Sequence, residues 1–119
     1  MAKKTFEING TSLSLDLLDA DENERVQKAR DTALAKINAP QEDATEAEKI
    51  RTLCDAVRGC FDDAFGAGTG AAICGISDKL DVCVDAYVRL CDACKKLGDT
   101  YVSATERRVA KMQPAPKDQ

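Results

Sequence analysis

A chain of 119 residues with 44% hydrophobic and 32% charged side chains has the length and composition of one folded domain, not of a disordered segment. Its net charge of −4 at pH 7 argues against a general nucleic-acid-binding protein, which needs a basic surface to neutralise phosphates. No apolar run approaches the ~20 residues of a membrane span, and the N-terminus lacks the apolar core of a signal peptide. We therefore expect a soluble cytoplasmic protein that contacts neither membrane nor nucleic acid.

The residues at 4–17 are predicted to form a β-hairpin. Asn9 and Gly10 tolerate the positive φ of a tight type I′ turn, and apolar residues alternate with polar ones on both sides of them. The alternating apolar residues are Phe6, Ile8, Leu13, Leu15 and Leu17. Because a lone hairpin is unstable in water, its apolar face is expected to lie on helices.

Apolar residues at helical spacing predict three long helices, over about 21–37, 45–65 and 78–104. Asp19 or Asp21 is positioned to cap the first, and Thr45 with Glu48 forms a capping box at the second. The predicted buried face of the first helix comprises Val26, Ala29, Ala33, Leu34 and Ile37.

The third helix is predicted to start after Ser77 or Asp78 as its N-cap and to be weakened or bent at Gly98. Its predicted buried face comprises Leu80, Cys83, Val84, Tyr87, Val88, Cys91 and Cys94. The basic and proline-rich C-terminus predicts a globular domain over residues 1–111 and a flexible tail over 112–119. The expected fold is α+β and mostly α, with the hairpin packed on a bundle of three main helices.

The stretch from Phe61 to Gly75 contains a G-x-G-x-x-A pattern, which in other settings cradles a dinucleotide phosphate. A dinucleotide loop needs a buried strand before it, whereas Phe61 and Phe65 here have the i, i+4 spacing of a helix. Asp62 and Asp63 would also repel a phosphate. We interpret the stretch as a helix-to-helix junction, with a left-handed C-cap at Gly66 and a short helical turn over 70–74.

The six cysteines allow a zinc or redox hypothesis, because Cys91 and Cys94 form a C-x-x-C pair. A second chelating pair at short spacing is missing, and the C-x-x-C lies within a helix on a predicted buried face. Free thiols that fill the core are the favoured interpretation. The chain also has no histidine, the commonest general base and metal ligand. We expect no enzymatic activity, no cofactor and no metal.

The order of the pieces resembles a family of short tail-region proteins of tailed phages and prophages, similar to tail assembly chaperones. The resemblance runs from F-E-I-N-G at residues 6–10 through L-L-D-A-D at 17–21 and covers about residues 4–104. Its most specific part is Phe61–Thr69, F-D-D-A-F-G-A-G-T. This chain departs from the family at Ala67, where an acidic residue is common, and at Cys74-Gly75, where Phe-Gly is common.

This resemblance implies a non-enzymatic helper in the cytoplasm of a bacterial host that binds a tape-measure or tail-tube protein. Strand-edge contacts are then expected from Phe6, Ile8, Leu13 and Leu15. A second hypothesis is an acidic phage inhibitor or adaptor that binds a host or defence protein. Its contacts are expected from Asp62, Asp63, Asp81 and Asp85. The sequence leaves open self-association, retention in the finished particle and the zinc or redox alternative.

Overall fold

The computed structural model describes the backbone of residues 4–112 and, within that range, the side chains of residues 4–99 and 106–111. Two antiparallel strands open the chain and four helices follow. The elements are β1 (Lys4–Ile8), β2 (Thr11–Leu15), α1 (Ala20–Ile37), α2 (Glu46–Phe65), α3 (Thr69–Cys74) and α4 (Leu80–Met112). The predicted α+β, mostly α fold is confirmed.

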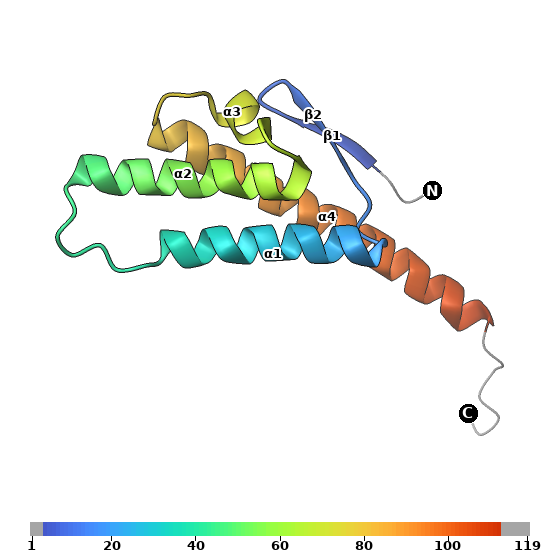
Figure 1. The fold of residues 1–119 in the computed structure, drawn as a ribbon. Helices are drawn as coiled ribbons and strands as arrows, with labels where there is room; N and C mark the ends of the chain where they lie inside the picture. Colours follow the sequence, from blue (N-terminus) through green and yellow to red (C-terminus); the bar gives the residue numbers. More distant parts are fainter. Residues whose placement is uncertain (1–3, 113–119) are drawn as a thin grey trace.

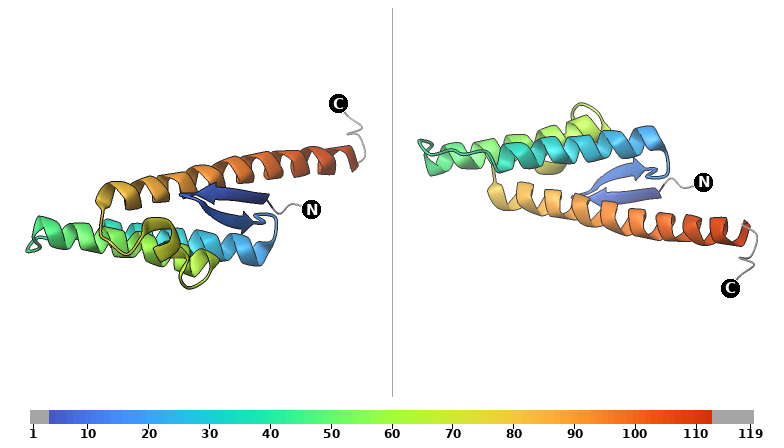
Figure 2. Two further views of the ribbon diagram at one scale, coloured as in Figure 1. Left: turned by 90° about the horizontal axis from the view of Figure 1, so that it is seen from above. Right: turned by 90° about the horizontal axis from the view of Figure 1, so that it is seen from below.

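Helices α1 and α2 lie antiparallel and pack closely together, while α4 runs along the other side of the molecule (Figure 1). The hairpin lies in the angle between this pair and α4, as both views in Figure 2 show. The last turns of α4 extend beyond the hairpin and give the molecule a long dimension of 65 Å. Among the described residues, no helix is both long enough and apolar enough to cross a membrane.

The hairpin turn forms as the sequence predicts. Asn9 and Gly10 have φ values of 50° and 82°, and Ile8 pairs with Thr11 across the two-residue turn. The side chains of Ile8, Leu13 and Leu15 are at most 4% exposed and form part of the core. These side chains face the helices and are not free to meet a partner's side chains, and strand-edge contact by the hairpin stays a prediction.

Helices α1 and α2 begin at the predicted capping residues. The Asp19 carboxylate accepts hydrogen bonds from the backbone N–H groups of Asp21 and Glu22. The Thr45 hydroxyl accepts from the Glu48 N–H at 3.1 Å, and the Glu48 carboxylate accepts from the Thr45 N–H at 2.9 Å. This reciprocal bonding lowers the pKa of Glu48. Local capping chemistry thus determines where both helices start.

The junction between α2 and α3 confirms a helix before the glycines, with one difference. Gly66 has φ 117° and ψ 152°, so it ends α2 in an extended conformation open only to glycine, and the predicted left-handed C-cap is wrong. The left-handed residue is Gly68, the N-cap of α3, with φ 92° and ψ −15°.

Helix α4 differs most from the prediction. It spans 33 residues and continues through Gly98 to Met112, beyond the predicted end near residue 104. Val84 and Val88, predicted to be buried, are 43% and 49% exposed. The buried face is rotated, and it is formed by Cys83, Ala86, Leu90 and Cys94. The predicted tail over 112–119 lies outside the described residues except for the backbone of Met112.

The rotation follows from the neighbours of α4. The helix packs on both α2 and β1, and its buried face includes Ala86, Cys83 and Leu90, all fully buried. Val84 and Val88 lie beside this face and stay exposed. An apolar residue at helical spacing therefore need not lie in the core.

Candidate protein-interaction site

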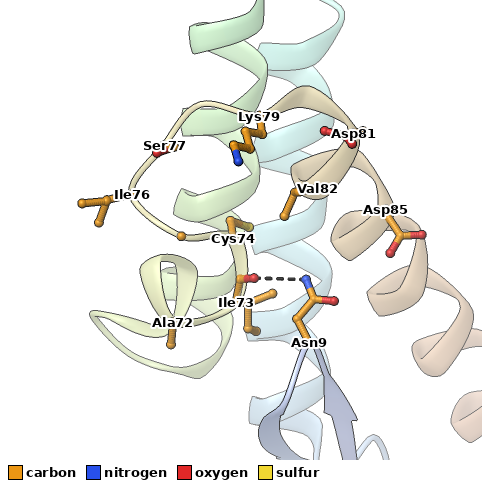
Figure 3. A pocket seen from close by; sticks show the side chains of 11 residues that line it. Asn9, Ala72, Ile73, Cys74, Ile76, Ser77, Lys79, Asp81, Val82 and Asp85 are labelled. Atoms are coloured by element: carbon orange, nitrogen blue, oxygen red, sulfur yellow. Dashed lines mark hydrogen bonds between the residues drawn. The ribbon is translucent and has the colours of Figure 1, made fainter.

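An open cleft of about 690 Å³ lies where the hairpin turn meets α3, the loop after α3 and the first turns of α4 (Figure 3). Ile76, in the loop, is the most exposed large apolar side chain and is 91% accessible to solvent. The lining side chains include Asn9, Ile73, Ile76, Val82, Asp81 and Asp85. The cleft thus combines apolar surface with two carboxylates, a surface suited to contact with another protein.

The hairpin turn is tied to α3 by one hydrogen bond across the base of the cleft. The Asn9 side chain donates from Nδ2 to the carbonyl oxygen of Ile73 at 3.1 Å (Figure 3). Asn9 therefore has two roles. It adopts the positive φ of the turn, and its amide fixes the position of that turn on the helical body.

Arg58, on α2, holds the loop that carries Ile76. Its guanidinium donates to the carbonyl oxygens of Gly75 at 2.8 Å and Ser77 at 2.7 Å, and to the Asp78 carboxylate at 2.8 Å. The hydrogen bond to Asp78 raises the pKa of Arg58, so the guanidinium stays charged. Asp78 is occupied by this contact, and α4 begins at Leu80, where the Lys79 carbonyl oxygen accepts a hydrogen bond from the Cys83 N–H at 3.1 Å. The loop is consequently fixed before any partner arrives.

The four acidic residues predicted to bind a partner do not form one surface. Asp81 and Asp85 lie on exposed turns of α4 at the cleft, where Asp85 also pairs with Arg89 at 2.9 Å. The Asp62 carboxylate accepts a hydrogen bond from the Gly70 N–H at 2.8 Å and so holds α3 against α2. Asp63 is exposed beside a separate depression between α1 and α2.

The aromatic residues fasten the hairpin to the helices. Phe6 is half-buried and meets Phe65 edge to face, with ring centroids 6.4 Å apart. Phe65 in turn stacks on Phe61, which is fully buried. Phe61 and Phe65 thus help to hold the hairpin and the helices together. Phe6 belongs to this cluster, so less of its ring is free for a partner than the sequence suggested.

The six cysteines are all free thiols, and five of them are buried. Burial raises the pKa of Cys54 and Cys60 to about 12. Cys91 is the half-buried exception. Over the residues whose side chains are described, no three His, Cys, Asp or Glu side chains are grouped in a way that would hold a metal ion. Reactive thiols have a lowered pKa, whereas burial raises the pKa of Cys54 and Cys60, so these two thiols have the properties of core residues.

Sequence reasoning missed Ile76 and Arg58. Ile76 is the one apolar residue in a run of turn residues from Gly75 to Lys79. Such an isolated apolar residue in a loop is the one available signal. Arg58 gave no signal, because its three loop partners lie 17 to 20 residues away in sequence.

Comparison with known proteins places this chain in a family. A family of unknown function, DUF6673, matches residues 9–116. The chain belongs to this family. No curated protein and no solved structure matches the chain.

The region matched by DUF6673 begins at the hairpin turn and leaves out β1. It includes Asn9, Arg58 and Ile76, and with them every contact that shapes the cleft. In this member of DUF6673, the cleft and the α2–α3 junction are thus parts of the region shared with the family.

Proposed function

We propose that this protein is a non-enzymatic phage tail assembly chaperone or tail accessory protein, acting in the host cytoplasm by binding a structural partner. The resemblance of Phe61–Thr69 to tail-region proteins supports the phage setting. The same segment builds the α2–α3 junction, which positions α3 beside the cleft. A tape-measure or tail-tube protein is the proposed partner.

The observation that carries the binding role is the exposure of Ile76 on a fixed loop at the cleft. Ile76 is 91% exposed, so binding of another protein over it would be favourable because apolar surface is removed from water. Because Arg58 already orders the loop, binding avoids the entropy cost of fixing it. The cleft would shield an apolar segment of the partner until that segment assembles.

Co-expression with tape-measure and tail-tube proteins from the genome that encodes this chain tests the proposal. We expect a complex that survives purification, together with more soluble partner. Ile76→Ser should weaken the complex, whereas Leu34→Ser, at a 47% exposed position on α1, is the matched control and should not. If neither tail protein forms a complex, the proposed tail role is wrong.

The alternative role, an acidic inhibitor or adaptor of a host or defence protein, is favoured by Asp81 and Asp85 at the cleft. A partner with a basic surface would then bind with an affinity that falls as salt rises. Neutralising both residues, in Asp81→Asn/Asp85→Asn, should weaken this binding, whereas Asp63→Asn should leave it unchanged. A captured host protein whose affinity is the same at low and high salt would argue against this role.

A further inference from the structure

Helix α4 carries an exposed apolar stripe along a face that no other element covers. Val84, Val88 and Val109 are each between 43% and 49% exposed. Val84 and Val109 are 25 residues apart, close to a whole number of helical turns, so they lie on the same side roughly 37 Å apart. Val84 therefore lies in the first turns of α4, and Val109 lies in its last turn, at the end of the helix that projects beyond the hairpin (Figure 1).

The stripe follows a seven-residue repeat. Val84 and Val88 occupy the d and a positions of a heptad, and Val109 falls again on a. Between these two ends of the stripe, the described a and d positions are Cys91, Lys95 and Gly98. A repeat of this kind is the pattern with which one helix packs on another.

A row of acidic residues borders the stripe at the same spacing. Asp85, Asp92, Asp99 and Glu106 are separated by seven residues each, and all four are exposed. They occupy the e position, which flanks the seam between paired helices. Asp85 has an ion pair with Arg89, but both side chains are more than half exposed, so that pair contributes little and is readily exchanged. The other three form no ion pair with the described side chains.

A second copy of this chain is a poor occupant of the stripe. In an antiparallel pair the e positions face each other, which would oppose one acidic row with another. In a parallel pair they face the g positions of the other copy. Two g residues, Tyr87 and Cys94, are turned toward the body: the Tyr87 hydroxyl donates to the Arg30 carbonyl oxygen at 3.3 Å, and Cys94 is buried. Neither arrangement gives the acidic row an opposite charge.

We infer that this face of α4 is the docking site for an amphipathic helix of a partner protein, with an apolar heptad seam and Lys or Arg beside it. The apolar seam would cover the valine stripe, and the basic side chains would face the acidic row. Lys95, an exposed a position between the two halves of the stripe, would set the register by meeting an acidic or polar residue. This inference rests on the proposed binding role and names the chemistry of the partner.

The test uses the full chain and two synthetic peptides of about four heptads with leucine at a and d. One peptide has Lys at the flanking positions and the other has Glu, so neither pairs readily with itself. Fluorescence anisotropy at physiological salt should show the Lys peptide binding roughly tenfold more tightly. Val84→Ser/Val88→Ser should weaken its binding by about the same factor.

A charge exchange provides the decisive control. Asp92→Lys/Asp99→Lys should reverse the preference so that the Glu peptide binds more tightly. Glu24→Lys/Asp31→Lys changes the net charge equally on exposed positions of α1 and should keep the original preference. Circular dichroism checks that every variant remains folded.

Several outcomes would overturn the inference. These are failure of both peptides to bind, equal binding of both, or an equal response to the two charge exchanges. A dimer in sedimentation that dissociates in Val84→Ser/Val88→Ser would assign the face to a second copy instead. Peptide binding without any complex in the tail-protein co-expression would reject the tail role alone. A tail complex without peptide binding would reject the helix-docking face alone.

Discussion

Gly70 of α3 lies directly against the backbone of Arg58 in α2. A Cβ atom at Gly70 would lie 2.7 Å from the Arg58 Cα and 2.8 Å from its carbonyl carbon, distances that real Cβ atoms do not adopt. The carboxylate of Asp62, which also lies on α2, accepts a hydrogen bond from the Gly70 N–H. This close approach lets a six-residue helix pack on α2 and form the wall of the cleft.

Gly70→Ala should therefore destabilise the protein by about 1–3 kcal/mol, because the added methyl group would push α3 away from α2. Gly59→Ala is the matched control: Gly59 lies inside α2 and has open space around its Cβ position. That substitution should stabilise the protein by up to about 1 kcal/mol through helix propensity. Urea unfolding measures both free energies. Equal effects of the two substitutions would contradict the close packing at Gly70.

Arg58→Lys should destabilise the protein by about 1–3 kcal/mol although the charge is kept. A lysine has one nitrogen and cannot replace the planar fork that binds Gly75, Ser77 and Asp78 together. The loop should also become more sensitive to proteolysis. Arg89→Lys, which alters only the exposed pair with Asp85, should remain within about 0.5 kcal/mol of the parent protein. Equal melting temperatures for Arg58→Lys and Arg89→Lys would show that Arg58 does not fix the loop.

Substitutions of core and of surface apolar residues should have different effects on stability and on partner binding. Leu15→Ala removes a fully buried side chain and should cost about 2–5 kcal/mol. Ile76→Ser changes an exposed side chain and should leave stability within about 0.5 kcal/mol while weakening partner binding. Chemical denaturation and pull-down, run on the same preparations, distinguish the two effects. A stable Leu15→Ala variant that loses its partner would restore the hairpin side chains as a binding surface.

Stability should fall in alkaline solution. Burial raises the pKa of Cys54 and Cys60 from 9.0 to about 12, and that of Tyr87 from 10.0 to about 12. Above pH 9 the unfolded chain loses these protons while the folded chain keeps them, so the unfolded state is favoured as pH rises toward 12. Below about pH 8 both states hold the protons, and these groups add little pH dependence.

Urea midpoints at pH 7, 9 and 10.5 check this expectation, with a small decline expected from pH 7 to 9 and a larger one from pH 9 to 10.5. Thiol titration at pH 8 gives a second measure, in which the half-buried Cys91 should react before the five buried cysteines. A midpoint that stays constant to pH 10.5 would mean that the buried thiols and Tyr87 do not keep their protons in the folded state.

The features that depend on neighbours in the chain could be predicted from the sequence. Asn9-Gly10 specified the turn because few other residue pairs adopt two positive φ angles. Thr45 and Glu48 specified the start of α2 because they bond to each other's backbone. The fold class, the hairpin and the three long helices followed from such local signals and from apolar periodicity.

Which side chains face water depends on how the elements pack, and the sequence did not predict it for α4. α4 has apolar residues over more than half its circumference, and contact with α2 and β1 selected Ala86 and Leu90 for the core and left Val84 and Val88 exposed. Arg58 reached its loop only because the chain folds back on itself. Burial and long-range hydrogen bonds depend on which elements meet, and no local pattern of residues contains that information.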